Sequence, residues 1–385
     1  MHILADQNIP HVDAAFQALG TVTTLPGHAI GPDEVAGAEV LLVRSVTAVD
    51  EALLRAKRAS GSTLAFVGSA TIGTDHVDQA LLRDRGVAFA HAPGSNAESV
   101  VEYVVTGLLA LHEREGLSHA GRTVGIIGVG QIGSRLAVRL EALGFRVLLN
   151  DPPRQENEPD QPFVRLDALL EESDIVTLHV PLTSDGPYPT RGFVDDQFLK
   201  RLQPGTWLVN SCRGGVVESE ALRTHRDQLG SLILDVWPNE PTPLPALIDA
   251  ADIATPHIAG YSFDGKLNGT LMLHEALCDV LGQPPRWSGE AERRPGSPLI
   301  AYTPPADLPE TARLSRLAQQ AYPIWRDDAQ FRTTLCRASS PAAGFRELRK
   351  TYPRRRAFGL WSVEDAGLAE KLGFEGGQTR SRALG

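Results

Sequence analysis

The chain has 385 residues, of which 42% are hydrophobic and 22% charged, and its formal net charge is −10 at pH 7. This length exceeds what one ordinary core accommodates, so we expect a soluble globular protein of two or three domains. The negative charge disfavours broad binding to nucleic acid. No run approaches the roughly eighteen apolar residues of a membrane-spanning helix, so no membrane association is expected.

Cysteine usage and the N-terminus indicate the compartment. The three cysteines, Cys212, Cys278 and Cys336, are odd in number, and no two stand at C-x-x-C spacing. They therefore do not indicate a disulfide framework, and they favour a reducing cytoplasm. The first residues, MHILADQNIPHVD, include an early acid and no basic region, which is not the pattern of a secretory signal.

The first 93 residues alternate short apolar runs with helix-like segments. Strands are expected within residues 2–8, 21–27, 39–47, 63–78 and 87–94, and helices over 10–20 and 52–60. Apolar strands separated by helices indicate a parallel sheet. We assign residues 1–93, joined by about 258–285, to a substrate-binding lid domain.

A long helix expected over residues 96–116 leads into a second and more regular series. Its strands are expected within residues 122–151, 173–182, 206–215, 231–237 and 251–257. We assign residues 94–257 to a nucleotide-binding domain. The sequence thus predicts an α/β protein with two doubly wound, Rossmann-like parallel sheets and a cleft between the two domains.

The composition changes again near residue 286. Five prolines lie between residues 286 and 310, which suits a linker. A helix is expected over residues 310–325, and a strand followed by a helix over 356–374. We therefore assign residues 286–385 to a small α+β C-terminal domain.

A glycine-rich turn provides the first functional motif. Its G-x-G-x-x-G spacing is formed by Gly128, Gly130, Gln131, Ile132 and Gly133, with Val129 between the first two glycines. The motif follows an expected strand and opens an expected helix, which is the context of a dinucleotide-binding fingerprint rather than of a merely structural turn. Its glycines allow a tight turn, a close approach to pyrophosphate and close packing of helix on strand.

An acid at the end of the next strand favours NAD over NADP. Asp151 follows Gly133 by eighteen residues, close to the expected offset of about 20 for a carboxylate that binds the ribose hydroxyls. A 2′-phosphate there would meet a like charge. Arg154 weakens this prediction, because a nearby arginine can hold a phosphate.

Three further motifs follow in order. They are N-S-C-R-G-G over residues 210–215, D-V-W-P-N-E-P over 235–241, and Pro256-His257. Together with the fingerprint they resemble the D-isomer-specific 2-hydroxyacid dehydrogenases, and residues 1 to about 285 follow the layout of that family. The resemblance implies an NAD-dependent oxidoreductase acting on a 2-hydroxy acid.

The resemblance also implies a catalytic set of Arg213, Glu240 and His257. A histidine suits proton transfer near neutral pH, so His257 would be the acid/base. Glu240 would bind its other ring nitrogen, and Arg213 would hold the substrate carboxylate. Taken singly, each has a structural alternative, and no spacing indicates a metal site. Their order after the fingerprint favours catalysis.

The same resemblance assigns further contacts to substrate and cofactor. The substrate would be contacted by Ser45, Thr71 and Tyr261, and NAD by Val180, Ser211, Cys212, Asp235 and Gly260. The family often has threonine where Val180 stands, so a contact there would be made through the backbone or by apolar packing. Arg44 would either bind a phosphate or form a buried ion pair, and the sequence leaves both open.

Several segments narrow the resemblance to a branch of the family that acts on a phosphorylated 2-hydroxy acid. These are residues 43–47, 68–78, 185–188 and 257–261, with the C-terminal extension. This branch implies a homodimer formed through the C-terminal domain, whose basic stretch 345–356 could lie near the partner's cleft. The alternatives are an enzyme of the 3-phosphoglycerate or hydroxypyruvate/glyoxylate type, and a non-catalytic NADH-sensing protein, because corepressors share the fold.

Overall fold

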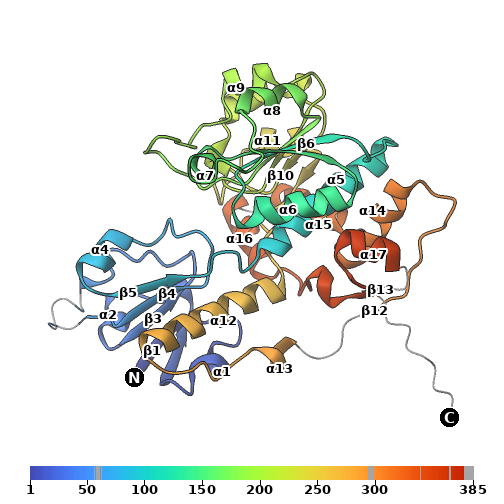
Figure 1. Ribbon diagram of the computed structural model, residues 1–385. Coiled ribbons are helices and arrows are strands. Elements are labelled where there is room, and N and C mark those ends of the chain that lie inside the picture. The colour runs from blue at the N-terminus through green and yellow to red at the C-terminus, as the bar shows by residue number, and fades with distance from the viewer. Residues whose placement is uncertain are drawn as a thin grey trace, which may run out of the picture. The chain divides into compact units, whose positions relative to one another are not determined.

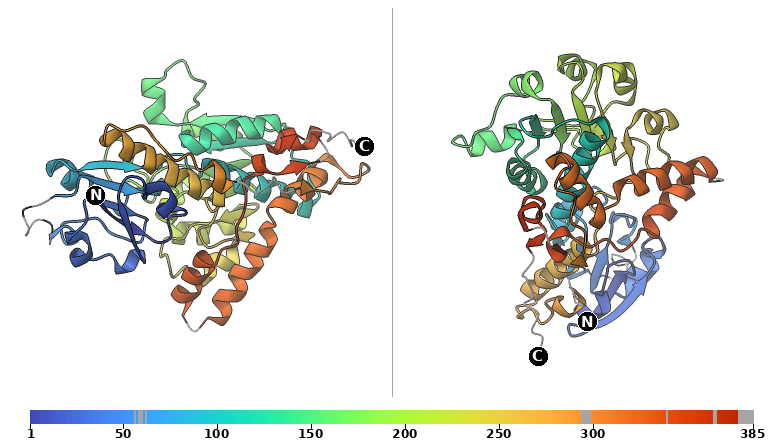
Figure 2. Two further views of the ribbon diagram at one scale, coloured as in Figure 1. Left: turned by 90° about the horizontal axis from the view of Figure 1, so that it is seen from below. Right: turned by 90° about the vertical axis from the view of Figure 1, so that its right-hand side faces the viewer.

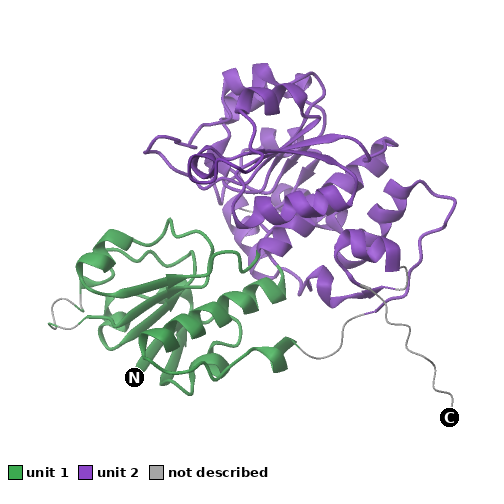
Figure 3. Ribbon diagram, in the orientation of Figure 1, with its two compact units in different colours: residues 1–96, 262–296 green, residues 97–261, 297–385 purple. Residues whose placement is uncertain are grey.

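The structure is a computed structural model that describes residues 1–55, 57, 61, 63–293, 299–338, 340–363 and 366–376. The chain divides into two compact units (Figure 3). Unit 1 comprises residues 1–96 and 262–296, and unit 2 comprises residues 97–261 and 297–385. The helix expected over 52–60 and the proline-rich linker each lie partly outside the described residues. In the part of the chain that is described, no helix is long and apolar enough to cross a membrane.

Unit 1 is built on a five-stranded parallel sheet (Figure 1). Its strands, in the order β2-β1-β3-β4-β5, are β2 (Thr21–Leu25), β1 (His2–Asp6), β3 (Val40–Val43), β4 (Phe66–Ser69) and β5 (Ala88–His91). Side chains alternate between its faces, so Ile3 packs with α1 (Val12–Phe16) and α12 (Phe263–Val280), whereas Leu4 packs with α2 (Pro32–Ala36) and α4 (Gln79–Asp84). The strand order reverses between β1 and β3, where open α/β sheets bind ligands.

Unit 2 contains a six-stranded parallel sheet in the order β11-β10-β9-β8-β6-β7. The strands are β6 (Thr123–Ile127), β7 (Arg146–Asn150), β8 (Ile175–Leu178), β9 (Trp207–Asn210), β10 (Leu232–Leu234) and β11 (Ile253–Ala254). Beyond β7 only an isolated bridge between Leu149 and Phe163 extends the sheet among the described residues. Here the order reverses between β6 and β8. The predicted fold class, with parallel sheets in two Rossmann-like units, is confirmed.

Helices cover both faces of the unit 2 sheet. One face packs against α5 (Ala97–Glu115) and α6 (Gln131–Ala142). The other packs against α8 (Leu166–Glu172), α9 (Asp196–Arg201), α10 (Ser219–Thr224) and α11 (Pro245–Ala250). A short helix, α7 (Pro152–Asn157), follows β7. The carboxyl ends of all six strands therefore lie at one edge, from which the loops with the predicted site residues emerge.

The C-terminal residues pack on unit 2. They form α14 (Glu310–Ala321), α15 (Ile324–Arg337), α16 (Pro341–Lys350), α17 (Ala366–Leu372) and a small parallel sheet of β12 (Leu299–Ile300), β13 (Ser362–Val363) and β14 (Glu375–Gly376). The helix α13 (Glu290–Arg293) precedes them in unit 1. The fully buried Leu314 and Leu317 of α14 join the core beside α5. Both views of Figure 2 show α15 and α16 as a hairpin that stands out from the rest of unit 2.

The structure modifies one sequence prediction in this region. The helix expected over residues 310–325 is interrupted, because α14 ends at Ala321 and α15 starts at Ile324. Pro323 lies in the gap between them. Proline has no N–H to donate and disfavours the helical conformation of the residue before it, here Tyr322, so a continuous helix is excluded.

Candidate active site

The glycine-rich turn of residues 128–133 joins β6 to α6. A Cβ at Gly128 would lie 2.6 Å from the His179 carbonyl oxygen, and one at Gly133 would lie 2.2 Å from the Gly128 carbonyl oxygen. Both positions therefore require glycine for packing within the protein. A Cβ at Gly130 would meet nothing within 4 Å, so internal packing does not require glycine there. An open position at a helix N-terminus fits the close approach of a pyrophosphate.

The carboxylate of Asp151 is tied to this turn. It accepts hydrogen bonds from the Val129 N–H (2.8 Å) and, as the cap of α7, from the Arg154 N–H (3.1 Å). The Arg154 guanidinium is itself engaged, since it binds both carboxylate oxygens of Glu158 and donates to the Val129 carbonyl at 2.5 Å. The arginine that weakened the preference for NAD is thus paired with an acid in this structure.

His179 and Cys212, at the ends of β8 and β9, add no charge to this edge. Burial lowers the pKa of His179 to about 3, which keeps its imidazole neutral. Burial raises the pKa of the Cys212 thiol to about 11, and the thiol contacts the Asn210 side-chain oxygen at 3.1 Å. The Ser211 hydroxyl is buried without a hydrogen-bond partner among the described residues. The predicted cofactor contacts Val180, Ser211 and Cys212 follow β8 and β9. They lie at the carboxyl edge of the sheet, beside the glycine-rich turn.

His257 and Glu240 form a hydrogen-bonded pair. The His257 Nδ1 lies 2.8 Å from one oxygen of Glu240, and the other oxygen accepts the Trp237 N–H at 2.9 Å. A carboxylate can only accept, so Nδ1 carries the proton and Nε2 is the nitrogen left for proton transfer. Burial raises the pKa of the Glu240 carboxyl, but the hydrogen bond and charge of His257 outweigh this effect, and the pKa is lowered overall.

The backbone of His257 is in an unusual conformation, and Asp235 supports it. His257 has φ 58°, in the left-handed region that non-glycine residues rarely adopt. The fully buried Asp235 carboxylate accepts the N–H groups of Ile258 (2.7 Å) and Ala259 (2.8 Å) and the Thr255 hydroxyl (2.7 Å). Both of its oxygens are thus occupied by the His257 loop. A contact between Asp235 and NAD stays a prediction.

The turn that carries Arg213 packs against the segment that leads to Glu240. The Asn210 side chain bridges the Cys212 N–H and the Arg213 carbonyl, each at 3.1 Å. A Cβ at Gly214 would lie 2.0 Å from the Trp237 carbonyl carbon, so the glycine after Arg213 permits this approach. Since β9, β10 and β11 are neighbours in the sheet, the three predicted catalytic residues leave adjacent strands at the same edge.

The predicted substrate contacts are divided between the two units. Arg44 and Ser45 follow β3, and Thr71 follows the adjacent β4, all in unit 1. The Thr71 hydroxyl donates to the Gly73 carbonyl and contacts Ser69. Arg44 forms no ion pair with any part of the chain that the structure describes, and its binding of a phosphate stays a prediction. Tyr261 and Gly260 belong to unit 2 and follow His257.

Two residues of the C-terminal segment contact the loop that follows His257, and sequence reasoning missed these contacts. The Arg349 guanidinium lies 5.4 Å from the centre of the Tyr261 ring, and its charge helps to lower the pKa of Glu240. Arg355 donates to the Tyr261 carbonyl at 2.9 Å. The basic stretch 345–356 was the available signal, but its position against the chain's own loop required the tertiary structure.

Comparison with known proteins identifies the family. Residues 87–259 match the family described as D-isomer specific 2-hydroxyacid dehydrogenase, NAD binding domain, and residues 297–372 match a domain of unknown function (DUF3410). The chain is 52% identical over 366 residues to the erythronate-4-phosphate dehydrogenase of Salinibacter ruber, with 92% of each chain covered. The chain belongs to the erythronate-4-phosphate dehydrogenase family. The Salmonella arizonae member of this family is 46% identical, covering 97% of this chain and 98% of its own length.

Two solved structures illustrate that the fold is shared. A protein from Thermus thermophilus is 28% identical and aligns with a TM-score of 0.60 over 74% of this chain and 99% of its own. The D-lactate dehydrogenase of Aquifex aeolicus, solved with NAD and lactic acid, gives a TM-score of 0.59 at 24% identity over 73% of this chain and 96% of its own. This chain thus combines a domain of the D-isomer specific 2-hydroxyacid dehydrogenase family with a C-terminal domain of unknown function.

Proposed function

We propose that this chain oxidises the 2-hydroxyl of 4-phospho-D-erythronate to (R)-3-hydroxy-2-oxo-4-phosphooxybutanoate with NAD, a step in pyridoxal 5′-phosphate synthesis. Family membership over nearly the whole chain supports the substrate. The observation that carries the chemistry is the His257–Glu240 pair, with one ring nitrogen held at 2.8 Å and the other available. A purely NADH-sensing protein does not require such a pair.

The proposed mechanism assigns proton transfer to His257. When bound, NAD supplies the acceptor for the hydride that leaves C2 of the substrate. The hydroxyl proton passes to Nε2 of His257 as the C–O bond becomes a carbonyl, so the step yields the oxo acid, NADH and a protonated imidazole. The Glu240 carboxylate stabilises that imidazolium, because its lowered pKa keeps it charged. The reverse reduction returns the same proton from Nε2.

Arginines are assigned to the anionic ends of the substrate. Arg213 would hold the carboxylate and polarise the developing carbonyl, for which a planar set of donors is suited. Arg44 would bind the phosphate, supported by its freedom from ion pairs in the described residues. Ser45, Thr71 and Tyr261 would complete the substrate contacts.

The proposal includes a cytoplasmic homodimer formed through the C-terminal residues. The cysteines are free, which fits a reducing compartment. We assign the contact with a second copy to the α15–α16 hairpin, which stands out from the rest of unit 2 (Figure 2). Light scattering on the full chain tests the assembly, with a mass twice that of one chain as the expected result. Charge reversal at the exposed Arg346 and Lys350 of α16 should then weaken the dimer, and an unchanged dimer would place the interface elsewhere.

Turnover on a panel of acids tests the function. Purified protein with NAD is given 4-phosphoerythronate, 3-phosphoglycerate, glycerate and erythronate, and NADH formation is followed by absorbance. The proposal expects the highest kcat/KM for 4-phosphoerythronate. Preference for 3-phosphoglycerate would assign the chain to another 2-hydroxyacid dehydrogenase type, and NADH binding without turnover of any acid would indicate a sensing role.

A further inference from the structure

A single buried arginine of the C-terminal segment holds the loop that follows His257. Arg355 is 6% exposed, and its guanidinium donates to the carbonyl oxygens of Tyr261 and Ala259, each at 2.9 Å. The same group donates to the Ser99 carbonyl at 3.2 Å. Its carbon lies 4.2 Å from the centre of the Tyr322 ring, which covers it as a cation–π partner.

These contacts complement those of Asp235. Asp235 binds the N–H groups of residues 258 and 259 from the sheet, and Arg355 binds the carbonyl groups of residues 259 and 261 from the C-terminal segment. The loop is thus fixed through both its N–H groups and its carbonyl groups. A left-handed residue such as His257, with φ 58°, persists only when its surroundings over-determine its conformation. The two charged side chains supply that constraint.

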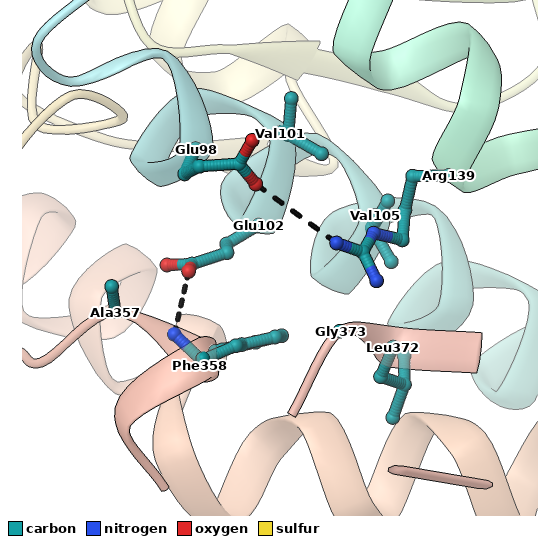
Figure 4. A pocket seen from close by; sticks show the side chains of 10 residues that line it. Glu98, Val101, Glu102, Val105, Arg139, Ala357, Phe358, Leu372 and Gly373 are labelled. Atoms are coloured by element: carbon teal, nitrogen blue, oxygen red, sulfur yellow. Dashed lines mark hydrogen bonds and ion pairs between the residues drawn. The ribbon is translucent and has the colours of Figure 1, made fainter. Parts of the chain in front are cut away.

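Arg355 also contacts the two segments of unit 2 at which the chain passes to or from unit 1. The unit boundaries fall after residue 96 and after residue 261, and the Arg355 contacts at Ser99 and Tyr261 lie within three residues of them. Glu102 anchors the arginine, with its carboxylate 3.6 Å from the guanidinium. The other oxygen of Glu102 accepts the Phe358 N–H at 2.6 Å, at the edge of a pocket of about 210 Å³ between α5 and the C-terminal segment (Figure 4).

We propose that Arg355 is a positioning residue for the reaction, and that the domain of unknown function over residues 297–372 therefore has a role in catalysis within its own chain. By clamping residues 259 and 261, it holds the His257 imidazole where Nε2 can take the substrate proton. The proposal rests on the proposed function for its kinetic consequence, whereas its structural consequence can be measured without substrate. Displacing a reacting group by about 1 Å can cost roughly a hundredfold in rate.

The test compares three variants of the full-length chain. Arg355→Met removes the clamp, and Arg355→Lys keeps the charge opposite Glu102 but cannot donate to three carbonyls in the fixed geometry of a guanidinium. The matched control is Arg332→Met. Arg332, on α15, also donates to two backbone carbonyls of unit 2, at Ile248 (2.6 Å) and Ala251 (2.7 Å), but not to the His257 loop.

The kinetic arm separates positioning from stability. For Arg355→Met and Arg355→Lys, kcat should fall about ten- to a hundredfold, while KM and the Kd for NADH change less than about threefold. Arg332→Met should lower Tm but keep kcat within about twofold of the wild type. If Arg355→Lys restores wild-type kcat, or if Arg332→Met loses as much kcat as Arg355→Met, the clamp does not position the catalytic loop.

Hydrogen exchange of the backbone provides the arm that needs no substrate. The amides of Ile258 and Ala259 should exchange faster in Arg355→Lys than in the wild type, by about tenfold or more, and should be unchanged in Arg332→Met. Normal protection of both amides in Arg355→Lys would overturn the inference even if the enzyme is active. If the wild type oxidises none of the acids, the proposed function fails, and exchange alone still decides whether Arg355 holds the loop.

Discussion

Replacing Glu240 by glutamine should shift the pH dependence of catalysis in both directions of the reaction. The carboxylate lies 2.8 Å from Nδ1 of His257 and is kept ionised by its lowered pKa, so it favours the protonated imidazole. An adjacent opposite charge typically shifts a pKa by about 1–3 units. The side chains of His257 and Glu240 are 31% and 23% exposed, so water reaches the pair and screens part of this interaction.

The sign follows from which form of His257 each direction needs. Oxidation requires the neutral base, so the acid limb of its kcat/KM profile should move to lower pH. Reduction requires the protonated acid, so its alkaline limb should also move down, and reduction at neutral pH should lose more rate than oxidation. Asp196→Asn is the control, because Asp196 contacts His225 at 2.6 Å in a similar pair away from the site. Limbs that stay in place in Glu240→Gln would refute the assigned role of Glu240.

Three further predictions concern cofactor choice, the phosphate and the thiols. Asp151→Asn keeps an acceptor for the Val129 N–H but removes the charge that disfavours a 2′-phosphate. The ratio of the NADP dissociation constant to the NAD dissociation constant should therefore fall by about tenfold, or about 1.4 kcal/mol. An unchanged ratio in fluorescence titrations would show that the charge does not select the cofactor. Arg44→Ala should raise KM for 4-phosphoerythronate by about ten- to a hundredfold, because it removes a charge-assisted contact of roughly 1.5–3 kcal/mol. The KM for erythronate, which has no phosphate, should not change. Equal effects on both acids would show that the role of Arg44 is structural. Iodoacetamide at pH 8 should label the exposed Cys336 well before Cys212, whose pKa is raised to about 11 by burial, and equal labelling in peptide mass maps would contradict the burial argument.

Local patterns were sufficient to predict the two parallel sheets. The buried strands are short apolar runs, such as residues 175–178 and 207–210, and each is separated from the next by a helix or a loop. The fingerprint was equally recognisable, since two of its three glycines are required by contacts within the protein itself. The C-terminal residues were harder to predict, because β12, β13 and β14 have only two residues each, too few to produce an alternating pattern.

The sequence predicted the catalytic residues of the candidate site, but not the side chains that hold the backbone of the His257 loop. Motif order led to Glu240 and His257, and the structure shows their hydrogen bond. No sequence pattern indicated that Asp235 holds the amides of residues 258 and 259. Nor did any pattern pair Arg355 with carbonyls nearly 100 residues away. Backbone groups are present at every residue, so a side chain that binds them leaves no trace in the sequence of its target.

The packing of the C-terminal residues determines what a deletion of residues 297–385 can show. Leu314, Leu317 and Ile324 are fully buried in the core beside α5. Burial of such a side chain stabilises the fold by about 1.5–3 kcal/mol, so the three together supply roughly 5–9 kcal/mol. That is comparable to the whole stability of a domain, about 5–15 kcal/mol. The truncated chain should therefore lose cooperative unfolding of unit 2 and NADH binding, as measured by calorimetry and fluorescence titration. A truncated chain that unfolds cooperatively and binds NADH like the full chain would show that α5 does not depend on α14, and only then would its lost activity report on catalysis or assembly.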